Sequence, residues 1–441
     1  MDIQVLKKVT VIKVLILTYY FPPCNFTAAS RPLSWFKYLY DFGYYPVVIT
    51  VDWSIEVLDA KVHNSVRVDT YDHGEIYYVS PTRTLRQRLI DYGVTGHVIG
   101  KIATFFDLLI SSFTTKFTPY ANIFNLANNY LIINPDANLL IASANPYPLF
   151  SIASRLAEKH PSLKWVADYR DDWSTKTLNK KYSLAYFIIN KADAVSEKKW
   201  LASSSCFISV SDLLIKRISN AINKPGYLVS NGYFEEDYPE CFANIESSSF
   251  VISYSGMLYL EQDVEAFILV LIECIIKYQS KIQIKLRFIG SISYPYTLDR
   301  LVKSMSGYES YLEVIQLVSR EKCISLEAEA DLLLMMAYGA EKGIPSSKLY
   351  QYIGHGIPIF VYPGDDDIID NIVSEQTFLG RRLENHVSAV NYLCELIERK
   401  INGESLKSKS AELNTLLFSR RYQTEKLAEI LNLVVQGRTL E

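Results

Sequence analysis

The sequence has little cysteine, little histidine and almost no net charge. Its six cysteines are separated by long stretches of chain, so we expect neither a disulfide framework nor a zinc site, and a reducing compartment is favoured. The six histidines show no metal-ligand spacing. A formal net charge of -3 over 441 residues gives no electrostatic reason to expect nucleic-acid binding. No G-x-G-x-x-G follows a predicted strand, which disfavours a dinucleotide-dependent oxidoreductase.

Long apolar runs are missing as well. The N-terminal segment MDIQVLKKVTVIKVLILTYYFPP contains a short apolar stretch that ends at two prolines and lacks a small-residue cleavage site, so no secretion signal is expected. No segment offers the roughly 18 mostly apolar residues that a transmembrane helix needs. We therefore expect a cytoplasmic protein that contacts a membrane, if at all, only through its surface.

What the sequence does contain is a regular alternation of strand and helix patterns. The apolar runs Val14–Tyr19 and Pro46–Val51 flank Ala28–Asp41, whose apolar residues have helical spacing, and together they make one βαβ unit. A second unit is expected from Asn138–Ser143, Leu149–Lys159 and Leu163–Ala167. The alternation starts again near Phe250. We predict an α/β protein with two Rossmann-like, doubly wound domains that face a cleft.

The boundary between the two domains is expected within Asn231–Ser249, which holds Asn-Gly, one proline and three consecutive serines. The predicted parts are an N-terminal domain, a C-terminal domain and a helical tail that packs back on the first domain, at residues 1–235, 236–405 and 406–441. Ligands of doubly wound sheets bind outside the carboxyl ends of the strands, so the cleft is the expected site.

The most informative loop precedes a helix in the second half of the chain. After the apolar strand Asp331–Met336, Ser346 or Ser347 can cap a helix whose first turn holds Lys348. A lysine there is disfavoured by the helix dipole, unless an anion such as a diphosphate occupies the helix N-terminus. The alternative is that Lys348 is a solvated surface lysine.

Five runs stand in order over nearly the whole chain, namely LILTYYFPPCNFTAASRPLSWFKYL, WVADYRDDW, VSNGY, YSGMLY and GIPSSKLYQYIGHGIPIFVYPG. Together they resemble retaining GT-B glycosyltransferases of the large family-four group, especially those that assemble bacterial surface polysaccharides. The resemblance implies transfer of a sugar, with retention and without metal or cofactor, from a UDP- or GDP-linked nucleotide-sugar to a glycan or lipid-linked acceptor. It also implies that the leaving phosphate helps to deprotonate the acceptor.

The resemblance implies a role for each matching position. Its donor-side residues would be Gly256, Arg320, Ser346, Ser347, Lys348 and Gln351. Its acceptor-side residues would be Asn25, Thr27, Arg31, Asp168 and Arg170. Catalytic roles would fall to Lys348, which faces the phosphates, and to Asp171, which would recognise a sugar hydroxyl. The alternative for the run around Asp168 is a local Asp–Arg ion pair with a helix cap.

Three departures from the family pattern concern Gly343 with Gln351, Met257 with Asp263, and Phe26 with Thr27. The first pair stands where the family often has two glutamates eight positions apart. The second stands where many members have Arg and Lys, and the third replaces the usual glycine pair of the first loop. The phosphates would then be held by Lys348, by helix N-termini and by Arg320.

Other interpretations remain open. The acids Asp365–Asp367 form either a metal site or, as we favour, the start of a helix, where acids are stabilised by the dipole. Three further functions are a sugar-nucleotide epimerase of the same architecture, a glycoside hydrolase, and a noncatalytic partner in glycan assembly. The epimerase would convert a donor without any acceptor, the hydrolase would act on artificial glycosides, and the noncatalytic partner would bind without turnover.

The stretch Lys101–Tyr120 combines large apolar residues with lysines at both flanks. As a helix it would be apolar over much of its circumference, with basic ends suited to anionic head groups, which predicts contact with the inner face of the cytoplasmic membrane. The alternative is a helix buried in the core of the N-terminal domain.

Overall fold

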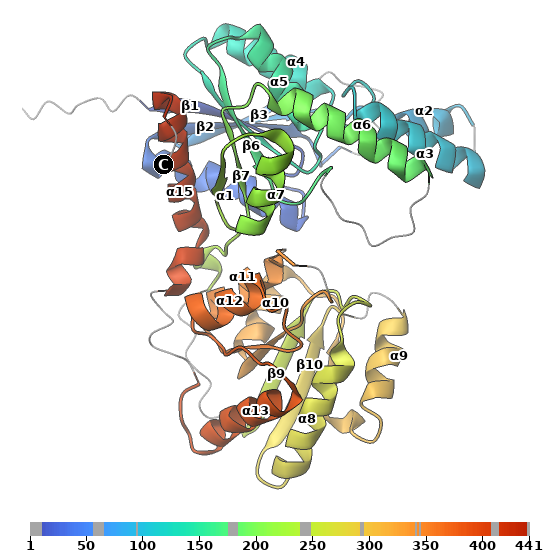
Figure 1. Ribbon diagram of the computed structural model, residues 1–441, viewed down its shortest axis with the longest axis vertical. Coiled ribbons are helices and arrows are strands. Elements are labelled where there is room, and N and C mark those ends of the chain that lie inside the picture. The colour runs from blue at the N-terminus through green and yellow to red at the C-terminus, as the bar shows by residue number, and fades with distance from the viewer. Residues whose placement is uncertain are drawn as a thin grey trace, which may run out of the picture. The chain divides into compact units, whose positions relative to one another are not determined.

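The computed structural model describes residues 11–55, 66–93, 96–174, 184–238, 248–291, 295–339, 342–343, 345–406 and 414–438. The chain divides into two compact units (Figure 1). One contains the residues up to Ser230 and those from Thr424 onward, and the other runs from Asn231 to Gln423. Each unit has one sheet with helices on both faces, which confirms the α/β, doubly wound class. That the two units face a cleft stays a prediction.

The first unit is built on an eight-stranded sheet with the order β3-β4-β2-β1-β5-β6-β7-β8. All neighbours are parallel except β3 and β4. The strands are β1 Ile12–Thr18, β2 Tyr44–Val51, β3 Val66–Tyr71, β4 Gly74–Val79, β5 Leu139–Ser143, β6 Lys164–Tyr169, β7 Cys206–Ser209 and β8 Gly226–Leu228. The strand order reverses between β1 and β5, and ligand crevices of such sheets lie at the carboxyl side of this reversal.

Helices cover both faces of this sheet because its strands are apolar on both sides. Leu15 and Leu17 of β1 share a core with α4, α5, α6 and α7, whereas Val14 and Ile16 share another core with α1 and the C-terminal α15. The helices are α1 Ser30–Tyr38, α2 Leu85–Asp91, α3 His97–Ser111, α4 Asn122–Ile133, α5 Leu149–Lys159, α6 Leu184–Leu201, α7 Asp212–Ile222 and α15 Arg420–Gln436. Alternate residues of β1 therefore pack into cores on opposite faces of the sheet, which gives three layers.

The second unit has a five-stranded, wholly parallel sheet with the order β11-β10-β9-β12-β13. Its strands are β9 Ser249–Ser255, β10 Gln283–Ile289, β11 Leu312–Ile315, β12 Leu332–Met335 and β13 Ile359–Val361. Its helices are α8 Val264–Tyr278, α9 Pro295–Ser304, α10 Arg320–Ala328, α11 Ser347–His355, α12 Ile368–Asn371 and α13 His386–Ile401. Here α8 and α13 cover one face, while α11 and α12 cover the other.

Folding brings two cysteines together that are far apart in the sequence. The sulfur atoms of Cys274 on α8 and Cys394 on α13 are 3.7 Å apart in the core, and both thiols are free. The long separation of Cys274 and Cys394 in the sequence therefore did not indicate that their side chains lie close together in the fold. Nowhere in the described ranges does a helix combine the length and apolar character that crossing a bilayer requires.

Candidate functional site

Lys348 lies in the first turn of α11, at the carboxyl end of the second sheet. The helix follows β12, which ends at Met335, and returns towards the start of β13 at Ile359. Ser346 is the N-cap, and its Oγ accepts a hydrogen bond from the backbone N–H of Lys348 at 3.3 Å. The positive end of the helix dipole therefore lies at the edge of the sheet where β9 ends, at Ser255.

The ammonium group of Lys348 is buried and has no hydrogen-bond partner among the described residues. Its Nζ lies 3.4 Å from the centroid of the Tyr254 ring, a cation–π contact that stabilises the charge but uses none of its N–H donors. Gly256, with φ +79°, lies alongside, since a Cβ on this residue would be 3.6 Å from Cε of Lys348. Burial lowers the pKa of Lys348 to about 7. A buried cation with unused donors is a group prepared for an anion.

The carboxylate that influences Lys348 most is that of Glu327 on α10, and it is already engaged. One of its oxygens bonds Nε2 of His355 at 2.8 Å, and the other accepts from Sγ of Cys323 at 3.6 Å. Glu327 and Cys323 raise the pKa of Lys348, but the effect of burial is larger. Neither Tyr254 nor Glu327 was a sequence-based candidate, because no local pattern joins them to the lysine.

The other predicted donor-side residues have varied surroundings. Ser347 begins α11, and Gln351 lies one turn after Lys348, half-buried and without a side-chain hydrogen bond within the described ranges. Arg320, the first residue of α10, is exposed, and its guanidinium is paired with Asp237 at 2.6 Å. Lys348 and Gln351 therefore have polar groups without a hydrogen-bond partner among the described residues. Arg320 would have to break its ion pair with Asp237 before it could contact the base of a nucleotide.

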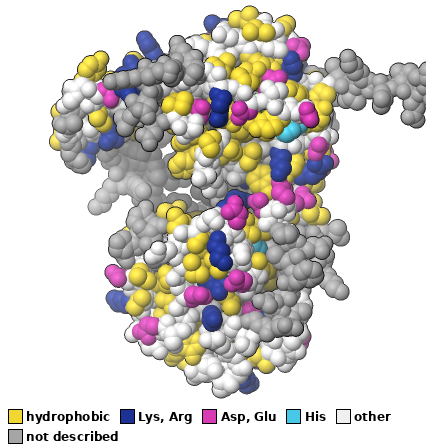
Figure 2. Space-filling view, turned by 180° about the vertical axis from the view of Figure 1, so that it is seen from behind, with side chains coloured by type: hydrophobic (Ala, Val, Ile, Leu, Met, Phe, Trp, Pro, Cys, Tyr) yellow, Lys and Arg dark blue, Asp and Glu magenta, His cyan; other side chains and the backbone are white. Residues whose placement is uncertain are grey.

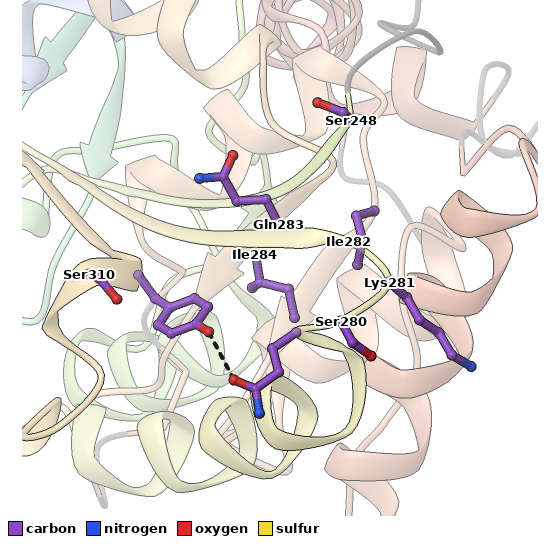
Figure 3. A pocket seen from close by; sticks show the side chains of 9 residues that line it. Ser248, Ser280, Lys281, Ile282, Gln283, Ile284 and Ser310 are labelled. Carbon is purple, nitrogen blue, oxygen red and sulfur yellow. Dashed lines mark hydrogen bonds between the residues drawn. The ribbon is translucent and has the colours of Figure 1, made fainter.

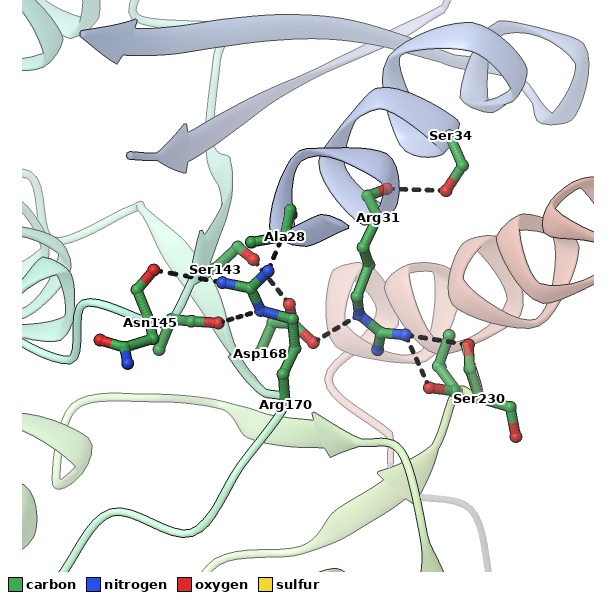
Figure 4. A network of polar contacts seen from close by, with 10 residues as sticks. Ala28, Arg31, Ser34, Ser143, Asn145, Asp168, Arg170 and Ser230 are labelled. Atoms are coloured by element: carbon green, nitrogen blue, oxygen red, sulfur yellow. Dashed lines mark hydrogen bonds and ion pairs between the residues drawn. The ribbon is translucent and has the colours of Figure 1, made fainter. Parts of the chain in front are cut away.

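At the carboxyl edge of the first sheet, Arg31 of α1 joins three segments of the chain (Figure 4). Its Nε donates to Oδ1 of Asp168 at 2.9 Å, and its Nη1 donates to the carbonyls of Val229 and Ser230 at 2.8 and 2.9 Å. The second oxygen of Asp168 accepts from Oγ of Ser143 at 2.7 Å. Both charged side chains are buried.

Arg170 connects a second set of carbonyls in the same region (Figure 4). Its guanidinium donates to the carbonyl oxygens of Ala28 at 2.7 Å, Ala144 at 2.5 Å and Asn145 at 3.1 Å. Ala28 belongs to the segment before α1, and the other two residues follow β5. Arg170 therefore fixes the loop before α1 against the end of β5.

The expected contact of Arg31, Asp168 and Arg170 with an acceptor stays a prediction. The side chains of Arg31 and Asp168 are 2% and 0% exposed and bond to protein groups, but Nη2 of Arg31 has no hydrogen-bond partner among the described residues. The ion pair that forms is not local, because Asp168 pairs with Arg31, 137 residues away. Arg170 holds the loop before α1 through the carbonyl of Ala28.

Three of the predicted residues are exposed near this edge. Asp171 comes two residues after β6, and its backbone carbonyl accepts a hydrogen bond from the hydroxyl of Tyr147 at 3.0 Å, while its exposed carboxylate has no hydrogen bond to a described residue. Asn25 and Thr27 are exposed in the loop before α1. Asp171, Asn25 and Thr27 thus remain accessible to a ligand.

A cavity of about 450 Å³ opens at the opposite edge of the second sheet (Figure 3). Its lining includes Gln283, which begins β10, Ser248, which precedes β9, and Tyr311, which precedes β11. The hydroxyl of Tyr311 donates to Oε1 of Gln279 at 3.3 Å. Because ligands of parallel sheets bind at the carboxyl ends of strands, this cavity at the amino ends is not part of the candidate site.

The acids after β13 serve as a helix start. The carboxylate of Asp365 accepts from the backbone N–H groups of Asp367, Ile369 and Asp370 at 3.0, 3.1 and 3.2 Å. The described part of the chain has no group of three or more His, Cys, Asp or Glu side chains that could hold a metal ion. The side chain of Asp365 therefore accepts from backbone donors at the start of α12, as expected for an acid at a helix start.

Comparison with known proteins identifies the fold. No protein-family model matches the chain, and no curated protein matches its sequence. Sucrose-phosphate synthase from Thermosynechococcus elongatus superposes with a TM-score of 0.64 at 12% identity, over 97% of this chain and 100% of that one. HepE from Anabaena, in complex with UDP, gives 0.59 at 13% identity, over 96% and 100%. Trehalose 6-phosphate synthase from Burkholderia multivorans gives 0.60 at 9% identity, over 97% and 99%. The chain thus has the GT-B fold of these enzymes over nearly its whole length.

Proposed function

We propose that the protein is a glycosyltransferase that takes a sugar from a nucleoside diphosphate sugar and transfers it, with retention, to a glycan acceptor in surface polysaccharide synthesis. The fold supports the proposal, since HepE of the same fold is solved with UDP and with UDP-glucose. The single observation that carries it is the buried, unpaired ammonium of Lys348 at the N-terminus of α11.

The diphosphate is the part of the donor that this site fits. Lys348 supplies free N–H donors and, in its protonated form, a full charge, and the helix N-terminus adds partial positive charge. Gly256 leaves room beside the lysine for an oxygen atom that a longer side chain would displace. Gln351, one turn along the helix, offers a neutral amide for ribose hydroxyls in place of the glutamate of related enzymes.

This arrangement would act on the leaving group. Breaking the bond between the sugar and the diphosphate places negative charge on the bridging oxygen, and fixed positive groups stabilise that charge in the transition state. The acceptor hydroxyl would attack from the face of the sugar that the diphosphate leaves, which gives retention without a protein nucleophile. The leaving phosphate would take the proton of that hydroxyl, so no protein base is required. Lys348 would therefore contribute both to donor affinity and to the rate of transfer.

A screen of the wild-type protein with nucleotides tests the proposal. We expect UDP or GDP, and one of their sugars, to raise the melting temperature, because a ligand at about 100 times its dissociation constant adds about 2.7 kcal/mol of stability. Incubation of the stabilising donor with lipid-linked or free glycans should then release the nucleoside diphosphate. A protein that no nucleotide stabilises would contradict the proposal.

The alternatives give different results in the same assay. Interconversion of the donor without acceptor would identify an epimerase, and cleavage of artificial glycosides without nucleotide would identify a hydrolase. Binding without turnover across the acceptor panel would favour a noncatalytic partner, which the neutral Gln351 makes worth testing.

We further propose that α3 and its neighbours contact an anionic membrane surface. Val98, Phe106 and the following Phe113 are 68%, 45% and 58% exposed, which leaves apolar surface for such a contact. Exposed basic residues lie on the same helices, at Arg86, Arg88, Lys101 and Lys191 or close to them at Lys116. We call α2, α3 and α6 the helical arm. At the upper left of Figure 2, hydrophobic and basic side chains lie together on the face that is shown.

The acids of this helical arm are used within the protein. Asp107 accepts from the backbone N–H groups of Leu85 and Arg86 at 2.8 and 3.0 Å, and Asp193 accepts from the hydroxyl of Ser112 at 2.6 Å. The charge that remains for a partner is therefore basic, which complements anionic head groups.

Liposome flotation tests this contact. Wild type should float with phosphatidylglycerol vesicles and not with phosphatidylcholine vesicles. Phe106→Ser/Phe113→Ser should remain at the bottom with an unchanged melting temperature. The matched control Leu269→Ser/Ile276→Ser removes two similarly exposed apolar residues from α8 and should still float. Equal flotation of the two double variants would contradict the proposal.

A further inference from the structure

Two loops at the carboxyl edge of the first sheet carry aromatic rings that touch one another. Tyr20 and Phe26 follow β1, and Trp53 follows the neighbouring β2. The ring centroids are 5.4 Å apart for Tyr20 and Phe26, 5.6 Å for Tyr20 and Trp53, and 5.8 Å for Phe26 and Trp53. We call these three residues the aromatic triad.

The aromatic triad packs against the protein on one side and is partly exposed to solvent. Nε1 of Trp53 donates to the carbonyl of Tyr19 at 2.8 Å, and the Tyr19 ring packs between Trp53 and Tyr120 at 4.9 and 5.4 Å. Phe26 is nevertheless 59% exposed, and Trp53 is only half-buried. Rings of this size that are fixed in place and left partly in water form a preorganised apolar surface.

Polar groups stand next to this surface. Asn25 and Thr27, on either side of Phe26, are exposed and offer an amide and a hydroxyl. The loop that bears them is anchored by the bond from Arg170 to the carbonyl of Ala28. An apolar platform bordered by neutral hydrogen-bonding groups suits a ligand with one apolar face and many hydroxyls.

We propose that the aromatic triad stacks against a pyranose ring of the glycan acceptor, with Asn25 and Thr27 bonding its hydroxyls. A pyranose presents C–H bonds on its face, and their positive hydrogen atoms pack on the negative face of an aromatic ring. The location agrees, because the loops that follow β1 and β2 lie at the ligand-binding edge of a doubly wound sheet. This inference rests on the proposed function for the identity of the ligand, but its residues belong to the first unit, whereas Lys348 belongs to the second.

Tryptophan emission gives a selective readout of the triad. Trp35, Trp165, Trp173 and Trp200 are buried, so Trp53 is the one partly exposed tryptophan of the five. The protein would be titrated with the methyl glycosides of glucose, galactose, mannose and N-acetylglucosamine, and with uridine as a flat-ring control. We expect a saturable emission change with at least one pyranoside and none with uridine.

Variants at Phe26 separate stacking from general apolar packing. Phe26→Leu keeps the apolar bulk and should raise the dissociation constant of the pyranoside about two- to tenfold, and Phe26→Tyr should restore it. Phe378→Leu changes a Phe of similar exposure, 52%, in the second unit and should have no effect. Binding of UDP, measured on the same preparations, should be equal in all four proteins.

Either of two results would overturn the inference while leaving the proposed function standing, provided that UDP still binds. One is that no pyranoside changes the emission, or that uridine changes it equally. The other is that Phe26→Leu binds the pyranoside as tightly as wild type. Loss of UDP binding in wild type would instead reject the proposed function.

Discussion

The carboxyl edges of the two sheets carry buried charged groups that differ in how many hydrogen bonds they make within the protein. In the first unit, Arg31 and Asp168 are buried and bonded to each other, to backbone carbonyls and to a hydroxyl. In the second unit, the ammonium of Lys348 is also buried, but it contacts the ring of Tyr254 and has no hydrogen-bond acceptor among the described residues. Arg31 keeps three hydrogen bonds and lacks a partner only at Nη2, whereas the ammonium of Lys348 has no hydrogen bond among the described residues. A largely bonded network holds a scaffold in place, whereas an unbonded charge is tolerated where a ligand completes it.

The largest effect should come from breaking the hydrogen-bonded network around Arg31. Asp168→Ala leaves the guanidinium of Arg31 buried without its partner, so we expect the first unit to lose about 3–5 kcal/mol of unfolding free energy. Urea denaturation followed by tryptophan emission reports on this unit alone, since all five tryptophans precede Ser230. Asp171→Ala, three residues later and exposed, is the control and should stay within about 0.5 kcal/mol. Similar losses in both variants would remove the distinction between scaffold and surface.

The unsatisfied lysine should behave in the opposite way. Lys348→Met keeps the apolar stem and removes a charge that is costly to bury, so the apoprotein should be no less stable than wild type. Its affinity for UDP should fall by about 1.5–3 kcal/mol, because a charge-assisted hydrogen bond is lost. Lys303→Met removes an exposed lysine from the same unit and should leave affinity unchanged. Calorimetry that finds equal affinities for the two variants would place the diphosphate elsewhere.

The pH dependence of binding should sharpen the comparison further. The pKa of Lys348 is about 7 in the free protein, against about 10.4 in an unfolded chain, so the group is largely neutral at pH 8. A bound diphosphate favours the charged form, and binding at pH 8 should therefore take up close to one proton. Affinity should fall as pH rises above about 7, by up to about tenfold per pH unit.

Calorimetry at pH 8 in two buffers of different ionisation enthalpy measures this proton. The observed binding enthalpy should differ between the buffers for wild type and agree for Lys348→Arg, since arginine stays charged throughout. Proton uptake by both proteins would assign it to a group other than Lys348.

The smallest effect should come from Gln351. If its amide bonds the ribose, Gln351→Ala should weaken UDP binding by about 0.5–1.5 kcal/mol. Gln351→Glu should be tolerated or should bind more tightly, because a carboxylate is the stronger acceptor. A Glu variant that unfolds would mean that the side chain contributes to packing and not to the site.

The elements that the sequence predicted best are those with local signals at both ends. Leu149–Lys159 was expected as a helix and forms α5 with the same bounds, since its apolar spacing begins after a proline. For α11, Ser346 is the N-cap, one of the two serines that the sequence offered for this position. The hairpin of β3 and β4 was not predicted, because Val66–Tyr71 is mostly exposed and lacks a buried alternate face.

The candidate site was predictable only as far as local chemistry reaches. The unfavourable place of Lys348 in the helix dipole was visible in the sequence, but its contact with Tyr254, 94 residues earlier, depends on how β9 and α11 pack. The partner of Asp168 was equally remote, since Arg31 lies 137 residues earlier and no local pattern joins the two. The exposure of α3 could not be read from its composition, which suits a core helix and a membrane surface alike.

The most direct test of the account follows the ammonium group of Lys348 itself. Protein labelled with ¹³C at the ε-carbon of lysine, with Lys348→Arg to assign the signal, would be titrated with pH in the absence and presence of saturating UDP. We predict that the Lys348 signal titrates near pH 7 in the free protein and moves well upward, towards or beyond pH 9, when UDP is bound. A signal that titrates at the same pH with and without UDP would contradict the central claim that this unpaired lysine is the group that holds the diphosphate.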